Sequence, residues 1–141
     1  MSAKFFLDTN ILAYAFTRQS LDKRKRASQL LELGLNTGAA TISFQVAQEF
    51  LNLSQRKLTP PMTLGEARIF IQEVLTPLCR VFPSTTLLGS AMEIKDRYKF
   101  HFYDSLIVAA ALEAGCERPY SEDLQHGQQI AQLRIENPFV T

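Results

Sequence analysis

The sequence has few cysteines and almost no net charge, and both absences exclude a class of protein. Its two cysteines, Cys79 and Cys116, lie far apart and match no zinc-ligand spacing, so we expect reduced thiols in a cytoplasmic setting instead of a disulfide framework. Fifteen basic and 14 acidic residues give a net charge of +1, without the basic footprint of an avid, non-specific nucleic-acid binder. Any contact with nucleic acid must therefore be local.

The sequence also lacks a long uninterrupted apolar run. Asp8 and Asn10 interrupt the apolar stretch in residues 1–16, which excludes a signal-peptide core and a membrane span there. No repeat, low-complexity tract or linker is visible. The 141 residues, 46% of them hydrophobic, suffice for one compact core. We therefore expect a single domain over residues 1–141 that is soluble and not exported.

Short apolar runs alternate with longer stretches of helical period, which predicts an α/β fold with a parallel sheet. Strands are predicted at residues 4–7, 39–42, 79–82, 118–120 and 133–136. Helices are predicted from residue 11 to 16 and at residues 21–35, 44–56, 64–75, 84–98 and 104–114. Gly115 is expected to end the last helix, and Pro60 and Pro61 to force an extended loop between two others.

Asp8 directly follows the first predicted strand and is followed by Thr9 and Asn10. In open parallel sheets, ligands bind beyond the carboxyl ends of the strands, so these polar side chains lie on the expected functional edge. Helix capping explains the three residues equally well, because Asp, Thr and Asn are all favoured at a helix N-terminus. The motif alone leaves both interpretations open.

Two further aspartates occupy comparable positions later in the chain. Asp104 opens a predicted helix that is apolar on nearly every face, so its first turn should lie at an edge of the sheet. Asp123 follows a predicted strand and is favoured over Glu122 by its spacing. Capping or a turn accounts for either aspartate as readily as metal binding does.

Glu49 shares one stripe of its predicted helix with Gln45, Gln48 and Asn52. The pattern favours a solvated helix face. A stripe of amides with one carboxylate is also what the edge of a metal pocket requires, and the residues alone do not decide between the two.

Several segments together resemble the PIN-domain ribonucleases, and within that family the VapC-type toxins. The segments are FFLDTNILAYAF near the start, QVAQEFLNL in the middle, and FYDSLIVAAALEAGC with SEDLQHGQ near the end. The resemblance spans nearly the whole chain. It matches the family's acidic quartet to Asp8, Glu49, Asp104 and Asp123, and its supporting polar positions to Thr9, Asn10 and Ser121.

The resemblance implies a three-layer α/β/α fold with about five short parallel strands, metal-dependent cleavage of RNA, a homodimer, and a cognate antitoxin. Oxygen ligands without a cysteine or histidine cluster select Mg²⁺ or Mn²⁺. Asp8 and Asp104 are expected to bind the metal directly, while Glu49 and Asp123 complete the site. The antitoxin is expected to cover the carboxylates, with an arginine reaching them.

One dense basic cluster, Lys23 to Arg26, falls in the first turn of a predicted helix. Its members are Lys23, Arg24, Lys25 and Arg26. Cations at this end oppose the helix dipole, and broken local rules tend to mark functional sites, here a grip on RNA phosphates. A solvated face is the alternative interpretation. The predicted helix at residues 64–75 is a candidate wall of the antitoxin groove or of the dimer contact.

Two other functions remain open for this sequence. A phosphohydrolase with a nucleophilic aspartate would need a second aspartate where Asn10 stands. A catalytically silent RNA-binding module would be expected to lack some of the four acids. Phe100, Phe102 and Tyr103 could stack bases, but core packing is the expected role of these aromatic residues, and of His101 among them.

Overall fold

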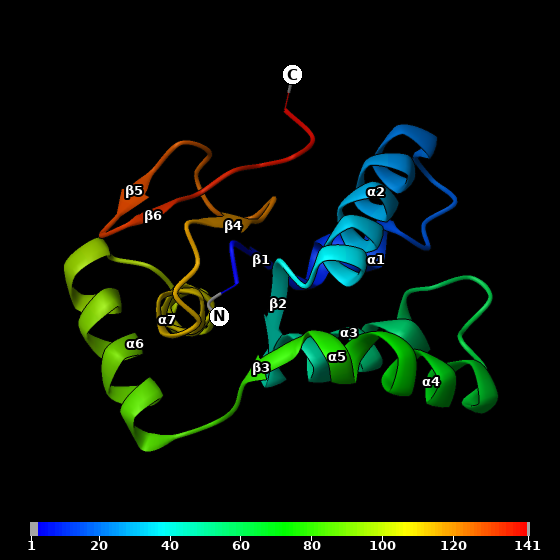
Figure 1. The fold of residues 1–141 in the computed structure, drawn as a ribbon, viewed down its shortest axis with the longest axis horizontal. Helices are drawn as coiled ribbons and strands as arrows, with labels where there is room; N and C mark the ends of the chain where they lie inside the picture. The colour runs from blue at the N-terminus through cyan, green and yellow to red at the C-terminus, as the bar shows by residue number, and fades with distance from the viewer. Residues whose placement is uncertain (1–2, 141) are drawn as a thin grey trace.

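The computed structural model describes residues 3–140, whose helices and strands are labelled in Figure 1. The strands are β1 (Phe5–Leu7), β2 (Ala40–Ser43), β3 (Cys79–Val81), β4 (Arg118–Tyr120), β5 (Gln129–Ile130) and β6 (Leu133–Arg134). The helices are α1 (Thr9–Tyr14), α2 (Leu21–Thr37), α3 (Phe44–Arg56), α4 (Leu64–Phe70), the π-helical turn η1 (Ile71–Leu75), α5 (Thr76–Leu78), α6 (Thr85–Tyr98) and α7 (Phe102–Glu113).

Four parallel strands form the central sheet in the order β3-β2-β1-β4. The chain leaves β1 towards β2 and β3 and then returns to place β4 on the other side of β1. The carboxyl ends of β1 and β4 therefore flank the point where the strand order reverses, which is where open α/β sheets bind their ligands. This topology confirms the predicted parallel α/β fold.

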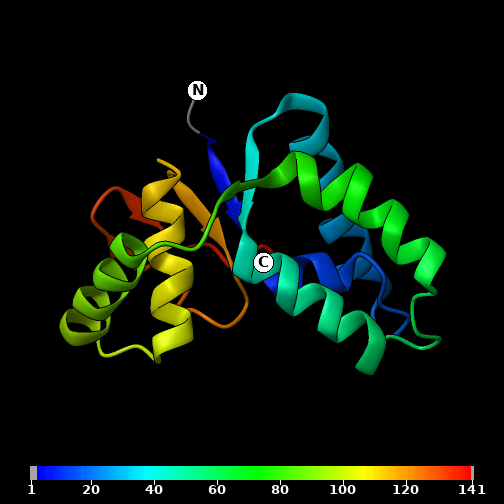
Figure 2. The ribbon, with the colours of Figure 1, turned by 90° about the horizontal axis from the view of Figure 1, so that it is seen from below.

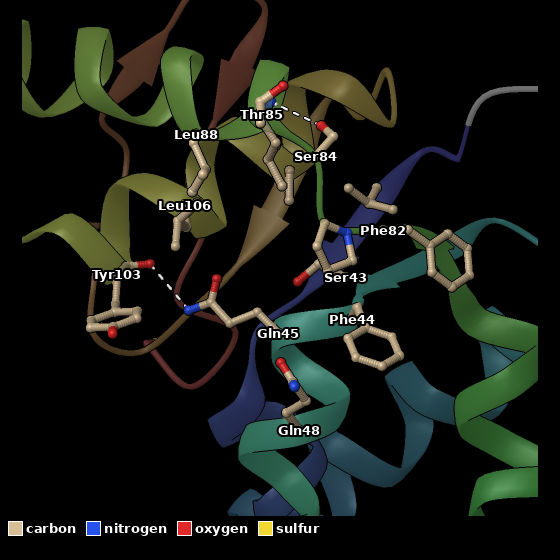
Figure 3. Close-up of a pocket in the computed structure, with 14 residues that line it drawn as sticks. Ser43, Phe44, Gln45, Gln48, Phe82, Ser84, Thr85, Leu88, Tyr103 and Leu106 are labelled. Atoms are coloured by element: carbon tan, nitrogen blue, oxygen red, sulfur yellow. Dashed lines mark hydrogen bonds between the residues drawn. The ribbon is translucent and has the colours of Figure 1, made fainter.

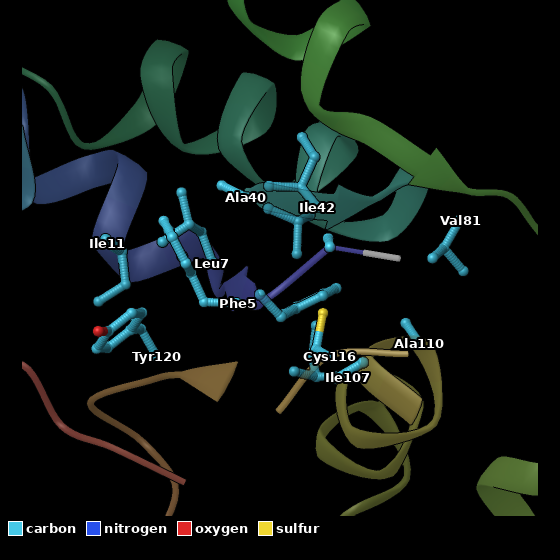
Figure 4. Close-up of a cluster of buried hydrophobic side chains, with 14 of the residues drawn as sticks. Phe5, Leu7, Ile11, Ala40, Ile42, Val81, Ile107, Ala110, Cys116 and Tyr120 are labelled. Carbon is cyan, nitrogen blue, oxygen red and sulfur yellow. The ribbon is translucent and has the colours of Figure 1, made fainter. Parts of the chain in front are cut away.

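Helices cover both faces of the sheet, as the three-layer prediction requires. Figure 2 shows α6 and α7 on one side of the strands and α1 to α5 on the other. Every residue of β1 and β2 is buried. Figure 4 shows side chains from both strands, among them Leu7 and Ile42, in one apolar cluster with Ile107 and Ala110 of α7. Burial on both faces explains why the strands read as continuous apolar runs without alternation.

The predicted fifth parallel strand, residues 133–136, is largely wrong. Leu133 and Arg134 pair antiparallel with β5, and only Glu136 joins the edge of β4, through an isolated parallel bridge to Tyr120. A tight reversal between β5 and β6, with Ala131 in the left-handed region (φ 52°), gives these residues an antiparallel partner before the chain reaches the sheet.

The observed helix ends differ from the predicted ones by a few residues, because of the caps. Helix α2 continues to Thr37, where Gly38 (φ 71°) ends it in the left-handed region. Helix α7 begins at Phe102, so Asp104 lies within its first turn and does not open it. Gly115 has a φ of 72° and follows the last turn of α7, as expected for a helix stop.

The helix predicted at residues 64–75 continues through η1 and α5 to Leu78. The π-helical turn precedes Pro77, which has no N–H to donate and whose ring would crowd the carbonyl four residues earlier. Both the N–H and the hydroxyl of Thr76 instead donate to the carbonyl of Ile71, and the wider turn accommodates the proline.

The structure also bears on two expectations drawn from composition. Cys79 and Cys116 are free thiols, as predicted, and burial raises the pKa of Cys116 to about 12. None of the helices in residues 3–140 has the length and apolarity needed to cross a bilayer.

Candidate active site at the carboxyl end of the sheet

Asp8 directly follows β1 and is buried, with 6% of its surface exposed. Its Oδ1 accepts a hydrogen bond from the backbone N–H of Thr9 (2.7 Å), which caps α1, and its Oδ2 accepts one from the hydroxyl of Ser121 (2.8 Å). Ser121 follows β4, so this bond spans the reversal in strand order. The Ser121 hydroxyl also accepts from the N–H groups of Asp123 and Leu124. Asp8 is therefore both a helix cap and the anchor of the loop that carries Asp123.

Glu49 lies on α3, which is capped by Ser43, the last residue of β2. The Ser43 hydroxyl accepts a hydrogen bond from the N–H of Val46. Oε1 of Glu49 accepts hydrogen bonds from the amide of Gln45 (3.1 Å) and the hydroxyl of Thr9 (3.4 Å). The same Gln45 amide donates to the carbonyl of Tyr103 in the first turn of α7 (3.3 Å; Figure 3). The amide stripe thus links α3 to the helices that carry the other acidic residues.

Three of the predicted acidic residues, Asp8, Glu49 and Asp104, have raised pKa values. Burial raises the pKa of Asp8 to about 6, against the hydrogen bonds from Ser121 and Thr9 that lower it. Burial also raises the pKa values of Glu49 and of Asp104, which lies half-buried in the first turn of α7. The negative charge of exposed Asp123 adds to all three increases. Asp8, Glu49 and Asp104 are thus each close enough to Asp123 to feel its charge, and we call the four residues the acidic cluster.

The donor groups of this cluster fit a hard divalent cation. All four are carboxylates, and a cation would relieve the repulsion that contributes to the raised pKa values of Asp8, Glu49 and Asp104. Asn10 lines the adjoining cavity, and among residues 3–140 its buried Oδ1 and Nδ2 have no hydrogen-bond partner. In the same described range, no three acidic, histidine or cysteine side chains surround a common point as ligands would. Binding would therefore have to draw the carboxylates together.

The four cations of the basic cluster at the start of α2 make different contacts, and only Lys23 forms an ion pair among residues 3–140. Lys23 Nζ forms an ion pair with Glu122 (2.5 Å) and donates to the hydroxyl of Tyr14 (3.3 Å), which itself bonds Glu122. The same Nζ lies over the rings of Tyr14 and Phe139. Burial raises the pKa of Glu122, but the hydrogen bonds from Lys23 and Tyr14 outweigh it and lower that pKa. Lys23 therefore fixes the position of Glu122, which precedes Asp123 in the sequence.

The other three cations of this cluster have different surroundings. Arg26 Nε donates to the carbonyl of Pro138, Lys25 is exposed, and Arg24 is exposed at a cavity formed with the loop between α3 and α4. The partners Tyr14 and Glu122 were missed by the sequence analysis. The only signal for Glu122 was its position beside Asp123.

A cavity of about 930 Å³ adjoins the acidic cluster. Thr9, Asn10, Glu49 and Asp123 line it together with two cations that the sequence analysis missed, Arg18 and Lys57. These two lie in loops almost forty residues apart in the sequence, so no local pattern joins them.

The expected core packing of the aromatic group is only partly correct. Phe100 and Phe102 are half-buried against the core, whereas His101 and Tyr103 are exposed, Tyr103 to 68%. Tyr103 occupies the second position of α7, on the outer side of the helix. It lines an apolar cavity of about 440 Å³ between α3, α6 and α7.

Comparisons with known proteins bear on the fold and family. The family model described as PIN domain matches residues 5–125. No curated protein sequence matches the chain significantly. A toxin–antitoxin complex from Klebsiella pneumoniae contains a chain with 20% identity and a TM-score of 0.68, with 98% of each chain covered. A chain of VapBC2 from Rickettsia felis, bound to a DNA fragment from its promoter, has 19% identity and a TM-score of 0.64. The match covers 94% of this chain and 96% of the other. VapC20 from Mycobacterium tuberculosis, a Sarcin-Ricin loop cleaving toxin, has 18% identity and a TM-score of 0.63. The match covers 85% of this chain and 90% of VapC20.

Proposed function

Because the chain belongs to the PIN domain family, we propose that it is a metal-dependent endoribonuclease and the toxin of a toxin–antitoxin pair. The observation that carries this proposal is the position of Asp8, which is buried at the carboxyl end of β1 with Glu49 and Asp123 close enough to act on its charge. Burial raises its pKa to about 6, and the charges of these two acids add to the increase. A structural helix cap gains nothing from such neighbours. A metal site requires them.

Four carboxylates would hold the cation, which we expect to be Mg²⁺ or Mn²⁺. Asp8 and Asp104 would bind it directly, and Glu49 and Asp123 would complete the site or hold its waters. A bound ion would supply Lewis acidity towards a phosphodiester and lower the pKa of a water molecule.

The surrounding side chains orient the carboxylates. Ser121 fixes Oδ2 of Asp8, and Thr9 and Gln45 fix Oε1 of Glu49. Asn10 presents two buried polar atoms at the same edge of the sheet. Ligands held in this way lose little freedom when a cation arrives, and such supporting residues typically change metal affinity by about 10- to 100-fold when they are removed.

We propose that the protein partner is an antitoxin that binds the acidic cluster and the apolar surface of α4 and η1. The unneutralised carboxylates would attract an arginine of the partner through charge-assisted hydrogen bonds. Leu64 and Ile69 of α4 and Ile71 of η1 are exposed and offer an apolar wall for a partner segment. The toxins of known structure that resemble this chain include members of VapBC complexes. We place the pair in the cytoplasm, where RNA is available.

We also infer that the chain forms a homodimer through the apolar cavity shown in Figure 3. Phe44, Phe82, Leu88 and Tyr103 line this cavity, and all four are exposed. Contiguous exposed apolar surface of this kind marks an interaction site. A two-fold dimer would bury the same surface on both copies at once.

The test compares the wild-type protein with Asp8→Asn and Asp104→Asn on single-stranded and structured RNAs, in Mg²⁺, in Mn²⁺ and in chelator. Cleavage by the wild type only with metal, and its loss in both variants, is the expected result. Glu93→Gln changes an exposed acid on α6 that lines neither of the two larger cavities; it is the matched control and should retain full activity.

Full activity in either aspartate variant would remove the role assigned to that residue. Cleavage that persists in chelator would contradict metal dependence. No cleavage of any RNA by folded wild-type protein would favour the silent RNA-binding module. Trapping of phosphate on Asp8 would favour the aspartyl-phosphate hydrolase.

A further inference from the structure

The cavity beside the acidic cluster extends well beyond it. One end is formed by Thr9, Asn10, Glu49 and Asp123, and the other by Phe16 and Arg18 of the α1–α2 loop and by Lys57 and Thr59 of the α3–α4 loop. A second cavity of about 310 Å³ shares Phe16, Arg18, Leu58 and Thr59 with the first and adds Arg24. Figures 1 and 2 both show the two loops side by side at one end of the molecule. We call this end of the cavity the basic end.

The cations of the basic end have no acidic partner. Arg18, Arg24 and Lys57 are exposed, and none of them forms an ion pair among residues 3–140, where the pairs use Lys23, Lys99 and Arg118. Glu66 also lines the second cavity, but its carboxylate accepts from the N–H of Thr63 in the capping box of α4. The cavity is therefore acidic where Glu49 and Asp123 lie and cationic at its other end.

Phe16 adds an aromatic surface beside these cations. Its ring packs against Phe50 (5.8 Å between centroids) and edge-to-face against Phe70 (5.3 Å), which fixes its orientation. The residue nevertheless remains 37% exposed and lines both cavities. A fixed, exposed ring next to unpaired cations is the combination that single-stranded nucleic-acid sites use, because a base stacks on the ring while cations hold the phosphates.

We propose that the basic end binds an unpaired stretch of RNA beside the bond that is cleaved, with Phe16 stacking a base and Arg18 and Lys57 holding phosphates. This proposal rests on the proposed ribonuclease function and adds the residues of this chain that would hold the strand. Lys57 follows Glu49 by eight residues on α3, about 12 Å along the helix axis, so a strand of a few nucleotides connects the two ends.

The charge distribution explains why such a site is needed. Negative side chains at the acidic end repel the phosphates of a substrate, and the net charge of +1 supplies no general attraction. Binding must therefore come from cations placed away from the reacting bond. Arg18 and Lys57 are the cations that line the same cavity as Glu49 and Asp123.

Salt dependence of RNA binding tests the proposal. Binding of a fluorescein-labelled single-stranded RNA of mixed sequence would be measured by anisotropy in chelator, so that no cleavage occurs, over a range of salt concentrations. Each phosphate contact on a single strand contributes about 0.7 to the slope of log K against log salt, so Arg18→Gln/Lys57→Gln should reduce the slope by about 1.4. Lys95→Gln/Arg134→Gln removes the same charges from the opposite end of the molecule, on α6 and β6, and should leave the slope unchanged.

Phe16→Leu tests the stacking separately. Leucine retains apolar contact with Phe50 and Phe70, so the fold is kept, and circular dichroism would verify this. Affinity for the single strand should fall by about tenfold with an unchanged salt slope, and affinity for the same sequence in a duplex should stay constant. An equal loss for both forms of RNA would overturn the stacking role.

A salt slope that is unchanged in Arg18→Gln/Lys57→Gln, or reduced equally in the control pair, would overturn the proposal. The basic end would then be a candidate binding site for an acidic segment of a protein partner. The wild-type cleavage assay separates this failure from failure of the proposed function. Metal-dependent cleavage with an unchanged slope would refute only the RNA site. A reduced slope without cleavage would support the RNA site and refute the nuclease.

Discussion

At the scale of single residues, Asp8 caps α1 and is a proposed metal ligand, and its burial carries an energetic cost. A carboxyl group of this kind has an ordinary pKa of 3.8, and in the folded protein burial raises it to about 6. Folding therefore disfavours its charged form. The cost is absent below pH 3.8, grows as the pH rises from 3.8 to 6, and is fully present above pH 6. A shift of this size corresponds to about 3 kcal/mol.

Asp8→Asn should therefore stabilise the metal-free protein in a pH-dependent way. Asparagine removes the charge but can accept only one of the hydrogen bonds from Thr9 and Ser121, which offsets about 1 kcal/mol at every pH. Relative to wild type, the free energy of unfolding of the variant should be larger at pH 7 than near pH 4 by about 2 kcal/mol, because the cost of the charged wild-type carboxylate is mostly absent near pH 4. Urea unfolding in chelator at several pH values measures this difference.

Asp22→Asn, at an exposed position of α2, is the matched control. A difference between Asp8→Asn and wild type that does not change with pH would mean that Asp8 ionises normally. The same pH dependence in Asp22→Asn would show that loss of any acid, and not of the buried one, produces the effect.

At the scale of elements, α2 lies against β2 at a point where only glycine fits. A Cβ on Gly34 would lie 2.3 Å from the Cβ of Ala40, closer than real side chains approach. Gly89, within α6, has open space around it. Both glycines lie within helices, so a comparison of their alanine variants separates the effect of helix propensity from the effect of packing.

Gly34→Ala should destabilise the protein by about 1–3 kcal/mol, because α2 must move away from β2. Gly89→Ala should stabilise it by about 0.5–1 kcal/mol, since alanine loses less backbone freedom on folding than glycine. Chemical denaturation of both variants measures the two changes. Stabilisation by Gly34→Ala would mean that α2 is not held against β2 as described.

The observed helices and strands also show which parts of the fold could be predicted from the sequence. The bounds of α3 were predicted correctly, because its apolar face is regular and its ends carry ordinary signals. The positions of Asp8, Ser121 and Asp123 could be predicted because they follow strands of a parallel sheet, and strand ends meet at one edge. The β5–β6 hairpin was missed because its two-residue strands carry too little pattern to distinguish antiparallel from parallel pairing.

The contacts of individual cations could not be predicted at all. Lys23 was interpreted as part of a phosphate grip, and the structure pairs it with Glu122, 99 residues later. Arg18 and Lys57 show no local signal of a shared cavity. Which long-range partner a charge meets depends on how the helices pack, and a local pattern does not contain that information.

At the scale of the whole molecule, the apolar cavity between α3, α6 and α7 and the cavity beside the acidic cluster are adjacent on α3, where Gln45 of the first cavity donates to Glu49 of the second. The two cavities have no lining residue in common. The proposed dimer contact and the proposed catalytic groove therefore use different surfaces. A variant that separates the copies should leave the carboxylates of each copy unchanged.

Phe82→Glu should convert the proposed dimer to a monomer, because it places a charge in the middle of an apolar contact. Phe82 is 57% exposed, so the monomer itself should remain folded. Size-exclusion chromatography with light scattering measures the mass. Leu21→Glu changes a comparably exposed apolar residue at the start of α2 and should leave the mass unchanged. A wild-type monomer, or a dimeric Phe82→Glu variant, would contradict the proposed contact.

The bond between Asp8 and Ser121 has a consequence for how the protein is made. Synthesis runs from the N-terminus, so Asp8 and Glu49 leave the ribosome long before Asp104 and before the strand that ends at Tyr120. Until β4 has paired with β1, Asp8 has no Ser121 to hold it and Asp123 has no place beside it. A nascent or prematurely terminated chain therefore carries an incomplete site. The topology delays completion of the proposed site until β4 and the residues that follow it have been synthesised.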